Sequence, residues 1–171
     1  DFLLGFAEST FRQGKYSDVM LIYLCKYFNG PTKQMAELWK AAGEFQIDTF
    51  DLEERILTQM LYTTDYTPHM EEIYESYCAG GGRDLVCMAY LSYFANMYLT
   101  EDAVVPEHVF RQIRERYLTG GDLNRVCRIA LLKYLSENHL SERDRKIADE
   151  LLDTCIRHNL YFAFFRKFDE K

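Results

Sequence analysis

Apolar residues recur along most of the chain at intervals of three and four positions, the spacing that places them on one face of an α-helix. Val19, Ile22 and Cys25 are an example. Short polar stretches separate the apolar segments, as in loops between antiparallel helices. The pattern predicts helices over residues 3–13, 17–29, 31–45, 50–63, 67–79, 83–99, 105–118, 122–138 and 142–158, with a further helix from 160.

Prolines mark the start of every second helix in this series. The steps from Pro31 to Pro68 and from Pro68 to Pro106 are nearly equal in length. Proline is favoured at the first helical position, where its missing N–H would have no intrahelical partner. We therefore expect each proline to open a helix. The next start is predicted at Ser141, because its Ser-x-x-Asp pairing with Asp144 is close to a capping box.

Residues 73–91 and 113–131 repeat one pattern forty positions apart. Eight of nineteen aligned positions are identical, where ordinary composition would give roughly one. The identical pairs are Ile73/Ile113, Glu75/Glu115, Tyr77/Tyr117, Gly80/Gly120, Gly81/Gly121, Val86/Val126, Cys87/Cys127 and Leu91/Leu131. Such a repeat indicates that one helix–turn–helix unit is stacked on copies of itself.

The predicted fold class is all-α, a right-handed α-solenoid of about four antiparallel helix hairpins with a period of 37–40 residues. A compact α-helical bundle is the alternative. We expect residues 1–171 to form a single helical-repeat domain. The chain begins at Asp1 without an initiator Met and ends on an apolar stretch, so we expect it to be a piece of a longer protein.

The run Gly14-Lys15-Tyr16-Ser17-Asp18-Val19 resembles the G-x-Y-x-x-A that opens the second helix of a tetratricopeptide repeat. It departs from that pattern at Val19, and the paired Trp and Leu-Gly of the family are absent. The likeness is to the wider superfamily of tetratricopeptide- and HEAT-like helical repeats. The segment from Ile22 to Leu57 also resembles very large bacterial proteins of the Clostridia type, which implies a fragment of a long helical protein and no catalytic motif.

Charge and cysteine content narrow the classes of partner. The net charge is −7, and residues 1–85 hold 7 basic against 14 acidic side chains. We expect neither nucleic acid nor an anionic membrane as partner, because phosphate binding needs clustered cations. The five cysteines form no CxxC pair, so reduced, buried thiols and a cytoplasmic location are expected. No apolar run reaches the length of about 20 residues that spans a membrane.

Three patterns could carry chemistry, and each has a structural interpretation. Gly80-Gly81-Gly82 precedes a helix and could cradle a phosphate, but the P-loop Lys and preceding strand are absent. A turn that needs positive φ is favoured. The acidic cluster at the start of the helix over 50–63 could bind a metal or transfer protons, but carboxylates also complement a helix N-terminus. The cluster consists of Asp48, Asp51, Glu53 and Glu54.

The histidines lack the i, i+4 spacing of a helical metal site. They are His69, His108, His139 and His158. A site built from one of them with Cys87 or Cys127 would require assembly over long range, and small core residues are the favoured interpretation of the repeated Val-Cys. We expect no catalytic residue, no cofactor and no metal.

The thirteen tyrosines suit either helix packing or a recognition surface, because each has a large apolar body with a polar tip. We expect Tyr77 and Tyr117 to pack between neighbouring units. The basic residues near the second repeat are Arg111, Arg114, Arg116, Arg125 and Arg128. They are expected to form a solvated, salt-bridged face. The candidate partner-binding residues are Tyr23, Tyr27, Tyr90, Tyr93, Arg128 and Tyr134.

The function predicted from these patterns is a non-enzymatic scaffold that binds a protein or peptide along stacked helix hairpins. A structural spacer or regulatory segment, in a protein whose activity lies elsewhere, is the alternative. An enzyme or ligand-binding bundle is the third possibility. It would require an enclosed pocket that joins Asp48, Asp51 or a histidine to convergent polar groups.

Overall fold

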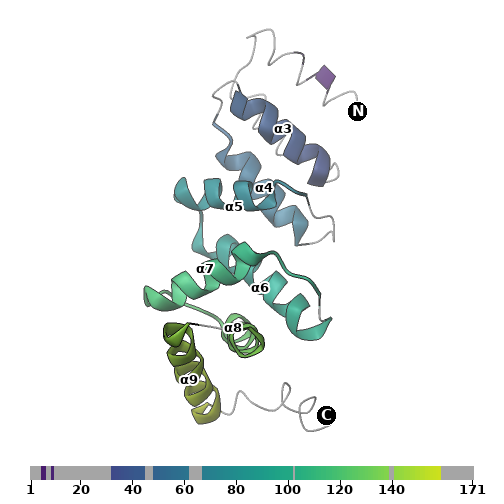
Figure 1. The fold of residues 1–171 in the computed structure, drawn as a ribbon. Helices are drawn as coiled ribbons and strands as arrows, with labels where there is room; N and C mark the ends of the chain where they lie inside the picture. Colours follow the sequence, from purple (N-terminus) through teal and green to yellow (C-terminus); the bar gives the residue numbers. More distant parts are fainter. Residues whose placement is uncertain are drawn as a thin grey trace. The chain divides into compact units, whose positions relative to one another are not determined.

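A computed structural model describes residues 5–6, 9, 32–44, 48–61, 67–101, 103–138 and 141–158. Within these ranges the chain is all-α, and no strand occurs. The helices are α3 (Thr32–Glu44), α4 (Phe50–Met60), α5 (Met70–Ala79), α6 (Asp84–Thr100), α7 (Glu107–Leu118), α8 (Arg125–Glu137) and α9 (Glu142–Arg157) (Figure 1). The predicted all-α class is confirmed, and the solenoid arrangement stays a prediction.

All seven described helices were predicted, with ends that agree to within three residues. The predicted helices over 17–29 and from 160 lie outside the described residues, as do Gly14 and Pro31. Only Gly5, Phe6 and Ser9 are described within the predicted helix over 3–13, and all three are helical.

Two compact units make up the chain, residues 1–90 and residues 91–171, and their boundary lies within α6. In the first unit α3 packs against α4, and α4 packs against α5. In the second unit α7 packs against α8, and α8 packs against α9. The extensive helix contacts within each unit therefore join helices that are consecutive in the chain.

The core of the first unit follows the helical spacing of the sequence. On α5, Met70, Ile73, Tyr74 and Tyr77 lie at i, i+3, i+4 and i+7 and are all buried. Such a stripe gives one apolar face, whose burial stabilises the helix against its neighbour. The remaining buried apolar residues on α3 and α4 are Met35, Ala36, Leu38, Ala42, Leu52, Ile56, Leu57 and Met60.

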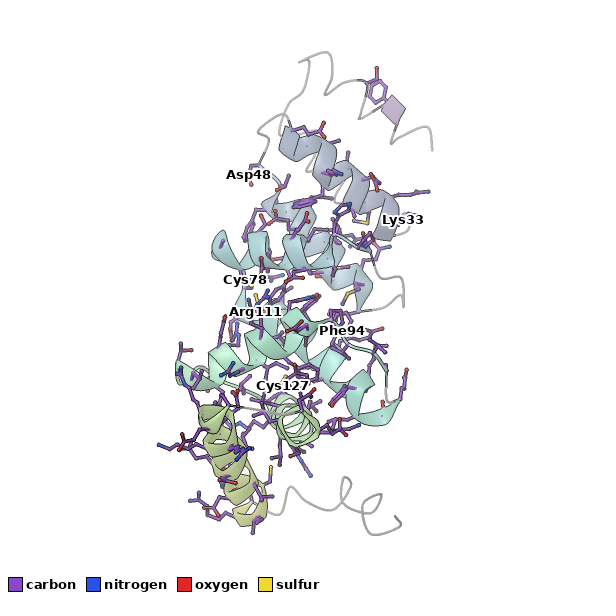
Figure 2. The ribbon with its side chains drawn as sticks, viewed as in Figure 1. Lys33, Asp48, Cys78, Phe94, Arg111 and Cys127 are labelled. Carbon is purple, nitrogen blue, oxygen red and sulfur yellow. The ribbon has the colours of Figure 1, made fainter. Side chains whose placement is uncertain are left out.

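The second unit also has one apolar helix face on α8, where Cys127, Ala130, Leu131 and Leu135 lie at i, i+3, i+4 and i+8 and are buried. Cys127 is labelled in Figure 2 on this helix. Its thiol is buried, and burial raises its pKa. The expectation that the repeated Val-Cys supplies small core residues is confirmed for both cysteines, since Cys87 is buried as well.

The glycine pairs end helices α5 and α7 in the same way. Gly81 and Gly120 have φ of 84° and 72°, in the left-handed region where a side chain would be strained. After α5, the Gly81 N–H donates to the Cys78 carbonyl and the Gly82 N–H to the Tyr77 carbonyl. These two bonds define a Schellman motif. The predicted positive-φ turn is confirmed.

The α7 turn repeats this motif, with Gly120 donating to Tyr117 and Gly121 donating to the Arg116 carbonyl. The step from Gly81 to Gly120 is one position shorter than the step of forty that separates the sequence identities. α7 therefore ends one residue earlier than α5 in the shared register. In the forty-residue register Asp122 stands where the first turn has Gly82, and the second turn is made by Gly120 and Gly121 instead.

The helix starts require one correction. Pro68 and Pro106 were predicted at the first helical position, but Pro106 is the N-cap of α7 and Pro68 precedes His69, the N-cap of α5. The Pro106 carbonyl accepts the Val109 N–H. At both positions the residue lies before the first helical residue, so a backbone N–H there would have no intrahelical acceptor. The start at Ser141 is confirmed, because its Oγ accepts from the Asp144 N–H and donates to Asp144 Oδ2 at 2.6 Å.

Candidate functional site

The acidic cluster at the start of α4 divides into two exposed and two engaged carboxylates. Asp48 and Asp51 are exposed, and Asp48 Oδ1 accepts the Phe50 N–H at 3.0 Å. These two fit the predicted solvated helix start. Glu53 and Glu54 correct that prediction, because each binds donors from other parts of the first unit.

Glu53 is 2% exposed and accepts three hydrogen bonds on Oε1. The donors are Trp39 Nε1 on α3 at 2.9 Å, Thr49 Oγ1 before α4 at 2.8 Å and Ser76 Oγ on α5 at 2.7 Å. A buried carboxylate is costly unless it is hydrogen-bonded, and these donors meet that need. One oxygen atom thus joins three consecutive helices of the first unit.

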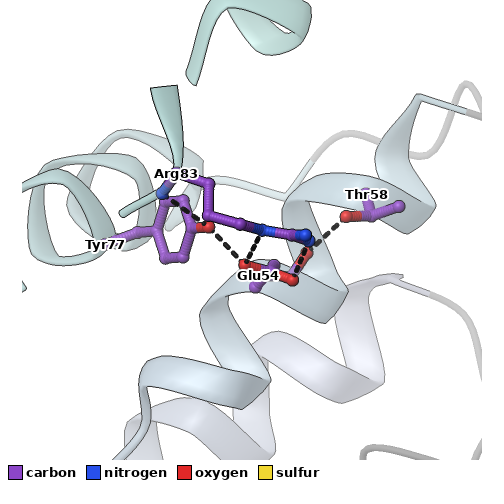
Figure 3. Close-up of polar contacts among 4 residues, drawn as sticks. All are labelled: Glu54, Thr58, Tyr77 and Arg83. Carbon is purple, nitrogen blue, oxygen red and sulfur yellow. Dashed lines mark hydrogen bonds and ion pairs between the residues drawn. The ribbon is translucent and has the colours of Figure 1, made fainter. Parts of the chain in front are cut away.

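Glu54 binds the turn that follows α5 (Figure 3). Arg83 donates to both carboxylate oxygens, from Nε to Oε2 at 3.0 Å and from Nη2 to Oε1. Tyr77 Oη donates to Glu54 Oε2, and the Arg83 backbone N–H donates to Tyr77 Oη at 3.1 Å. Arg–carboxylate pairs with two parallel bonds fix geometry as well as charge, so this trio holds α4 to the turn.

The electrostatics of the trio favour an ionised Glu54 carboxylate and a neutral Tyr77 phenol. Burial disfavours the charged form of Glu54, but the hydrogen bonds from Tyr77 and Arg83 and the charge of Arg83 outweigh it and lower its pKa. Burial and the bond to Glu54 raise the pKa of the Tyr77 phenol. A general base or acid works best with a pKa near the operating pH, and both shifts move away from it.

The glycine turn leaves no backbone donor for a phosphate. The N–H groups of Gly80, Gly81 and Gly82 donate to carbonyls of α5, and the Arg83 N–H donates to Tyr77. A phosphate cradle needs several N–H groups that point at the ligand. The geometry therefore supports a structural turn at Gly80-Gly81-Gly82 and not a phosphate site.

In the ranges that the structure describes, no group of three or more His, Cys, Asp or Glu side chains could hold a metal ion. His69 Nδ1 lies 3.5 Å from Glu72, and its ring is 6.4 Å from the Trp39 ring. His108 is buried at the start of α7. His139 lies outside the described residues.

Polar side chains in the second unit are likewise bound between helices. Lys133 on α8 is 8% exposed, and its Nζ donates to the Tyr98 carbonyl in the last turn of α6 at 3.2 Å. A cation at a helix C-terminus is favoured by the helix dipole. Tyr98 Oη in turn donates to Glu137.

The Asp144 carboxylate at the start of α9 is 7% exposed and lies 2.6 Å from Arg114 Nη2 of α7. This ion pair agrees with the predicted salt-bridged character of the arginines in this region. Tyr117 donates to Glu150 on α9 at 3.0 Å, whereas its repeat counterpart Tyr77 donates back to α4. Both tyrosines pack between helices, in opposite directions along the chain.

The candidate partner-binding residues occupy different environments. Tyr23 and Tyr27 lie outside the described residues. Tyr90 is 0% exposed and stacks on Tyr74 with ring centroids 4.4 Å apart, so its side chain offers no surface to a partner. Tyr93 is half-buried, with an edge contact to Phe94.

Arg128 and Tyr134 are half-buried on α8. Arg128 Nε donates to the Leu123 carbonyl at 2.9 Å. Tyr134 stacks on Phe110 with ring centroids 4.1 Å apart.

Sequence reasoning missed the burial of Glu53, although a signal was present. Glu53, Ile56, Leu57 and Met60 lie at i, i+3, i+4 and i+7, so the acid stands on the apolar stripe of α4. On α9, Asp144 likewise lies three positions before Ile147 and seven before Leu151, on the apolar face of the helix. A carboxylate that interrupts an apolar stripe therefore marks a buried acceptor in both helices.

Comparison with known proteins gives a match over the full sequence. A family with the description "Family of unknown function (DUF5717)C-terminal" matches residues 1–171. No curated protein and no solved structure matches the chain. Among the helices that the structure describes, none combines the length and apolar character needed to cross a membrane.

Proposed function

The chain belongs to the DUF5717 family of unknown function, in the part described as C-terminal, and we propose that it is a non-enzymatic helical-repeat scaffold that binds a protein or peptide. In this proposal the helix hairpins stack as a right-handed α-solenoid with a period of 37–40 residues. Stacked repeats contact their neighbours and present an extended surface, which is the property that such proteins use for binding.

The observation that carries the proposal is the regular succession of helices and turns. The extensive packing within each unit joins consecutive helices. α3 packs on α4 and α4 on α5 in the first unit, and α7 packs on α8 and α8 on α9 in the second. Two Schellman turns of the same construction recur, one at Gly81 and one at Gly120. Nearest-neighbour packing and a recurring turn are both expected of a repeat array.

The contacts of several polar side chains within the chain support a non-enzymatic role. Glu53, Glu54 and Arg83 hold helices and a turn together. Lys133 and Asp144 do the same in the second unit. A catalytic group must instead reach a substrate, whereas Glu53, Lys133 and Asp144 are bound by other groups of this chain.

The proposed contact residues are Tyr93, Arg128 and Tyr134, together with Tyr23 and Tyr27 from the sequence. Tyrosine and arginine, with tryptophan, are the residue types most enriched where the binding energy of an interface concentrates. Tyr90 is left out of this set, because its side chain is buried.

The test is a comparison of partners captured by the wild-type chain and by a variant with Tyr93→Ala and Arg128→Glu. Arg145→Glu, on an exposed position of α9, is the matched charge-reversal control. We expect the double variant to lose captured proteins that the control retains, with unchanged helical circular dichroism in both.

Capture of the same proteins by the double variant and by wild type would contradict the proposed surface. If the wild-type chain captures nothing, while deletion of the segment disables other domains of its parent protein, the spacer or regulatory role would replace the scaffold.

A further inference from the structure

Two cysteines face each other across the turn between α5 and α6. Cys78 lies in the last turn of α5 (Figure 2), Cys87 lies in the first turn of α6, and both carry thiols. Their Sγ atoms are 3.1 Å apart, whereas a disulfide has an S–S length of about 2.05 Å. A movement of about 1 Å therefore separates this contact from a covalent bond.

The turn holds both cysteines in place through its own hydrogen bonds. The Cys78 carbonyl accepts the Gly81 N–H at 3.2 Å. The Cys87 N–H donates to the Arg83 carbonyl at 3.2 Å. Arg83 is itself bound to Glu54 and Tyr77. Since two groups held in contact react far faster than two free groups, the fold favours a bond between these two sulfurs.

The pairing is a property of this turn and not of the repeat. Forty residues further on, Cys127 corresponds to Cys87, but Leu118 stands at the position of Cys78. The α7–α8 turn shows that the Schellman motif forms without a cysteine at the end of the preceding helix. The structural role of the turn therefore does not explain why Cys78 is present.

We propose that Cys78 and Cys87 are an oxidisable pair that forms an intramolecular disulfide by exchange with a small-molecule disulfide such as glutathione disulfide. Cys78 is half-buried and Cys87 is 2% exposed, so Cys78 meets the oxidant. The bond then closes a ring around the three glycines and fixes the end of α5 to the start of α6.

The exchange balances in two steps. The Cys78 thiolate attacks one sulfur of glutathione disulfide, forms a mixed disulfide and releases one glutathione thiolate. The Cys87 thiol loses its proton to solvent, and its sulfur attacks Cys78 Sγ and releases the second glutathione. The protein loses two electrons and two protons, and glutathione disulfide is reduced to two thiols.

The experiment equilibrates the full 171-residue chain with mixtures of glutathione and glutathione disulfide, alkylates the remaining thiols with iodoacetamide and maps the peptides by mass. Trypsin cleaves after Arg83, between the two cysteines. We expect peptides 56–83 and 84–111 to be joined, with two hydrogen atoms lost and no alkyl group on either cysteine. The oxidised chain should also unfold at a temperature raised by roughly 5–10 °C.

Cys87→Ser should abolish the joined peptides, and Cys127→Ser is the matched control that should leave them unchanged. The proposal would be overturned if Cys78 and Cys87 both remained alkylated at every glutathione ratio. Glutathione retained on Cys78 without a bond to Cys87, or a bond from Cys78 to Cys25, would also overturn it. These readings come from the wild-type chain, so they do not depend on how well a variant folds.

Discussion

Glu53 and Glu54 are neighbours in sequence, but their carboxylates have different partners. Glu53 accepts bonds from neutral donors on three sides and is buried. Glu54 forms an ion pair with Arg83, which lies in the turn after α5. Adjacent positions on a helix face directions about 100° apart, which is why two identical side chains join α4 to different parts of the first unit.

Removal of Glu53 should be costly. Glu53→Ala leaves the donors of Trp39, Thr49 and Ser76 without their acceptor, so we expect the free energy of unfolding to fall by about 3 kcal/mol. Glu37→Ala, at an exposed position of α3, should change it by less than about 0.5 kcal/mol. Urea denaturation followed by circular dichroism measures both, and equal losses would contradict the role assigned to Glu53.

The contribution of Glu54 to stability should depend on pH. Its pKa is lowered from the ordinary value of 4.5, because its bonds to Tyr77 and Arg83 and the Arg83 charge outweigh burial. A carboxyl with a lower pKa in the folded state stabilises the fold above the unfolded value and loses that contribution as pH falls through the folded value.

We therefore expect the stability of wild type to decrease more steeply than that of Glu54→Gln as pH falls from neutral to below 4.5. Urea unfolding at a series of pH values measures the two slopes. Parallel curves would show that the Glu54 charge contributes nothing to folding.

The hydrogen-bond donors that meet these acids could not be predicted from α4 by itself. Two of the three donors to Glu53 come from residues 14 positions before it and 23 positions after it. Helical spacing is a local property, whereas the choice of acceptor depends on which side chains the neighbouring helices bring to the same point. The sequence placed Glu53 on an apolar stripe, and only the fold shows what meets it there.

At the scale of the elements, the turns depend on glycine for two separate reasons. Gly81 and Gly120 have positive φ. Gly82 has a different constraint, because a Cβ there would lie 2.5 Å from the Tyr77 ring and 2.7 Å from its carbonyl oxygen. At Gly121 the closest atom would be the Arg116 carbonyl oxygen, at 3.3 Å.

Gly82→Ala should consequently destabilise the chain more than Gly121→Ala. We expect a loss of about 1–3 kcal/mol for the first, since the Tyr77 backbone must shift. The second should cost less than about 1 kcal/mol. Comparison of the two free energies of unfolding is the test, and a larger loss for Gly121→Ala would contradict the geometry of the α5 turn.

The N-cap of α9 offers a second prediction for an element. Ser141→Ala removes the hydroxyl that accepts the Asp144 N–H, and a lost N-cap side chain costs about 1 kcal/mol. Ser136→Ala, whose hydroxyl only donates to the Leu132 carbonyl within α8, is the control and should have a smaller effect. Thermal unfolding followed by circular dichroism ranks the two.

Helix positions were predicted well because their signals are local. Apolar spacing, the glycine pairs and Ser141 each act within a few residues. The starts of α5 and α7 were misplaced by up to three residues, since Pro68 and Pro106 favour any position where an N–H is not needed, and the first helical position is one of several.

At the scale of the whole molecule, the proposed solenoid makes a measurable prediction. A compact globule of 171 residues has a radius of gyration of about 16 Å. A stack of helix hairpins is longer than a globule of equal mass, so small-angle scattering should give a clearly larger value and an asymmetric distance distribution. A radius equal to that of the globule would favour the compact bundle and contradict the solenoid.

Helix order could be predicted from the sequence, but the partner and its binding surface could not. Repeat identities report the positions that neighbouring copies share, which are core and turn residues such as Cys127 and Gly120. The proposed contact residues Tyr93 and Arg128 stand at positions that differ in the forty-residue register, so the shared pattern does not indicate them.

The one-residue offset between the two Schellman turns has a consequence for how such a chain diverges. Because a helix advances about 100° per residue, the chain leaves α5 and α7 at different azimuths relative to the core residues Ile73 and Ile113, which keep the forty-residue register. A glycine pair that moves by one position along the sequence therefore changes the direction in which the chain leaves the helix relative to its buried stripe. The direction of the following segment is thus set by the position of two small residues at the helix end.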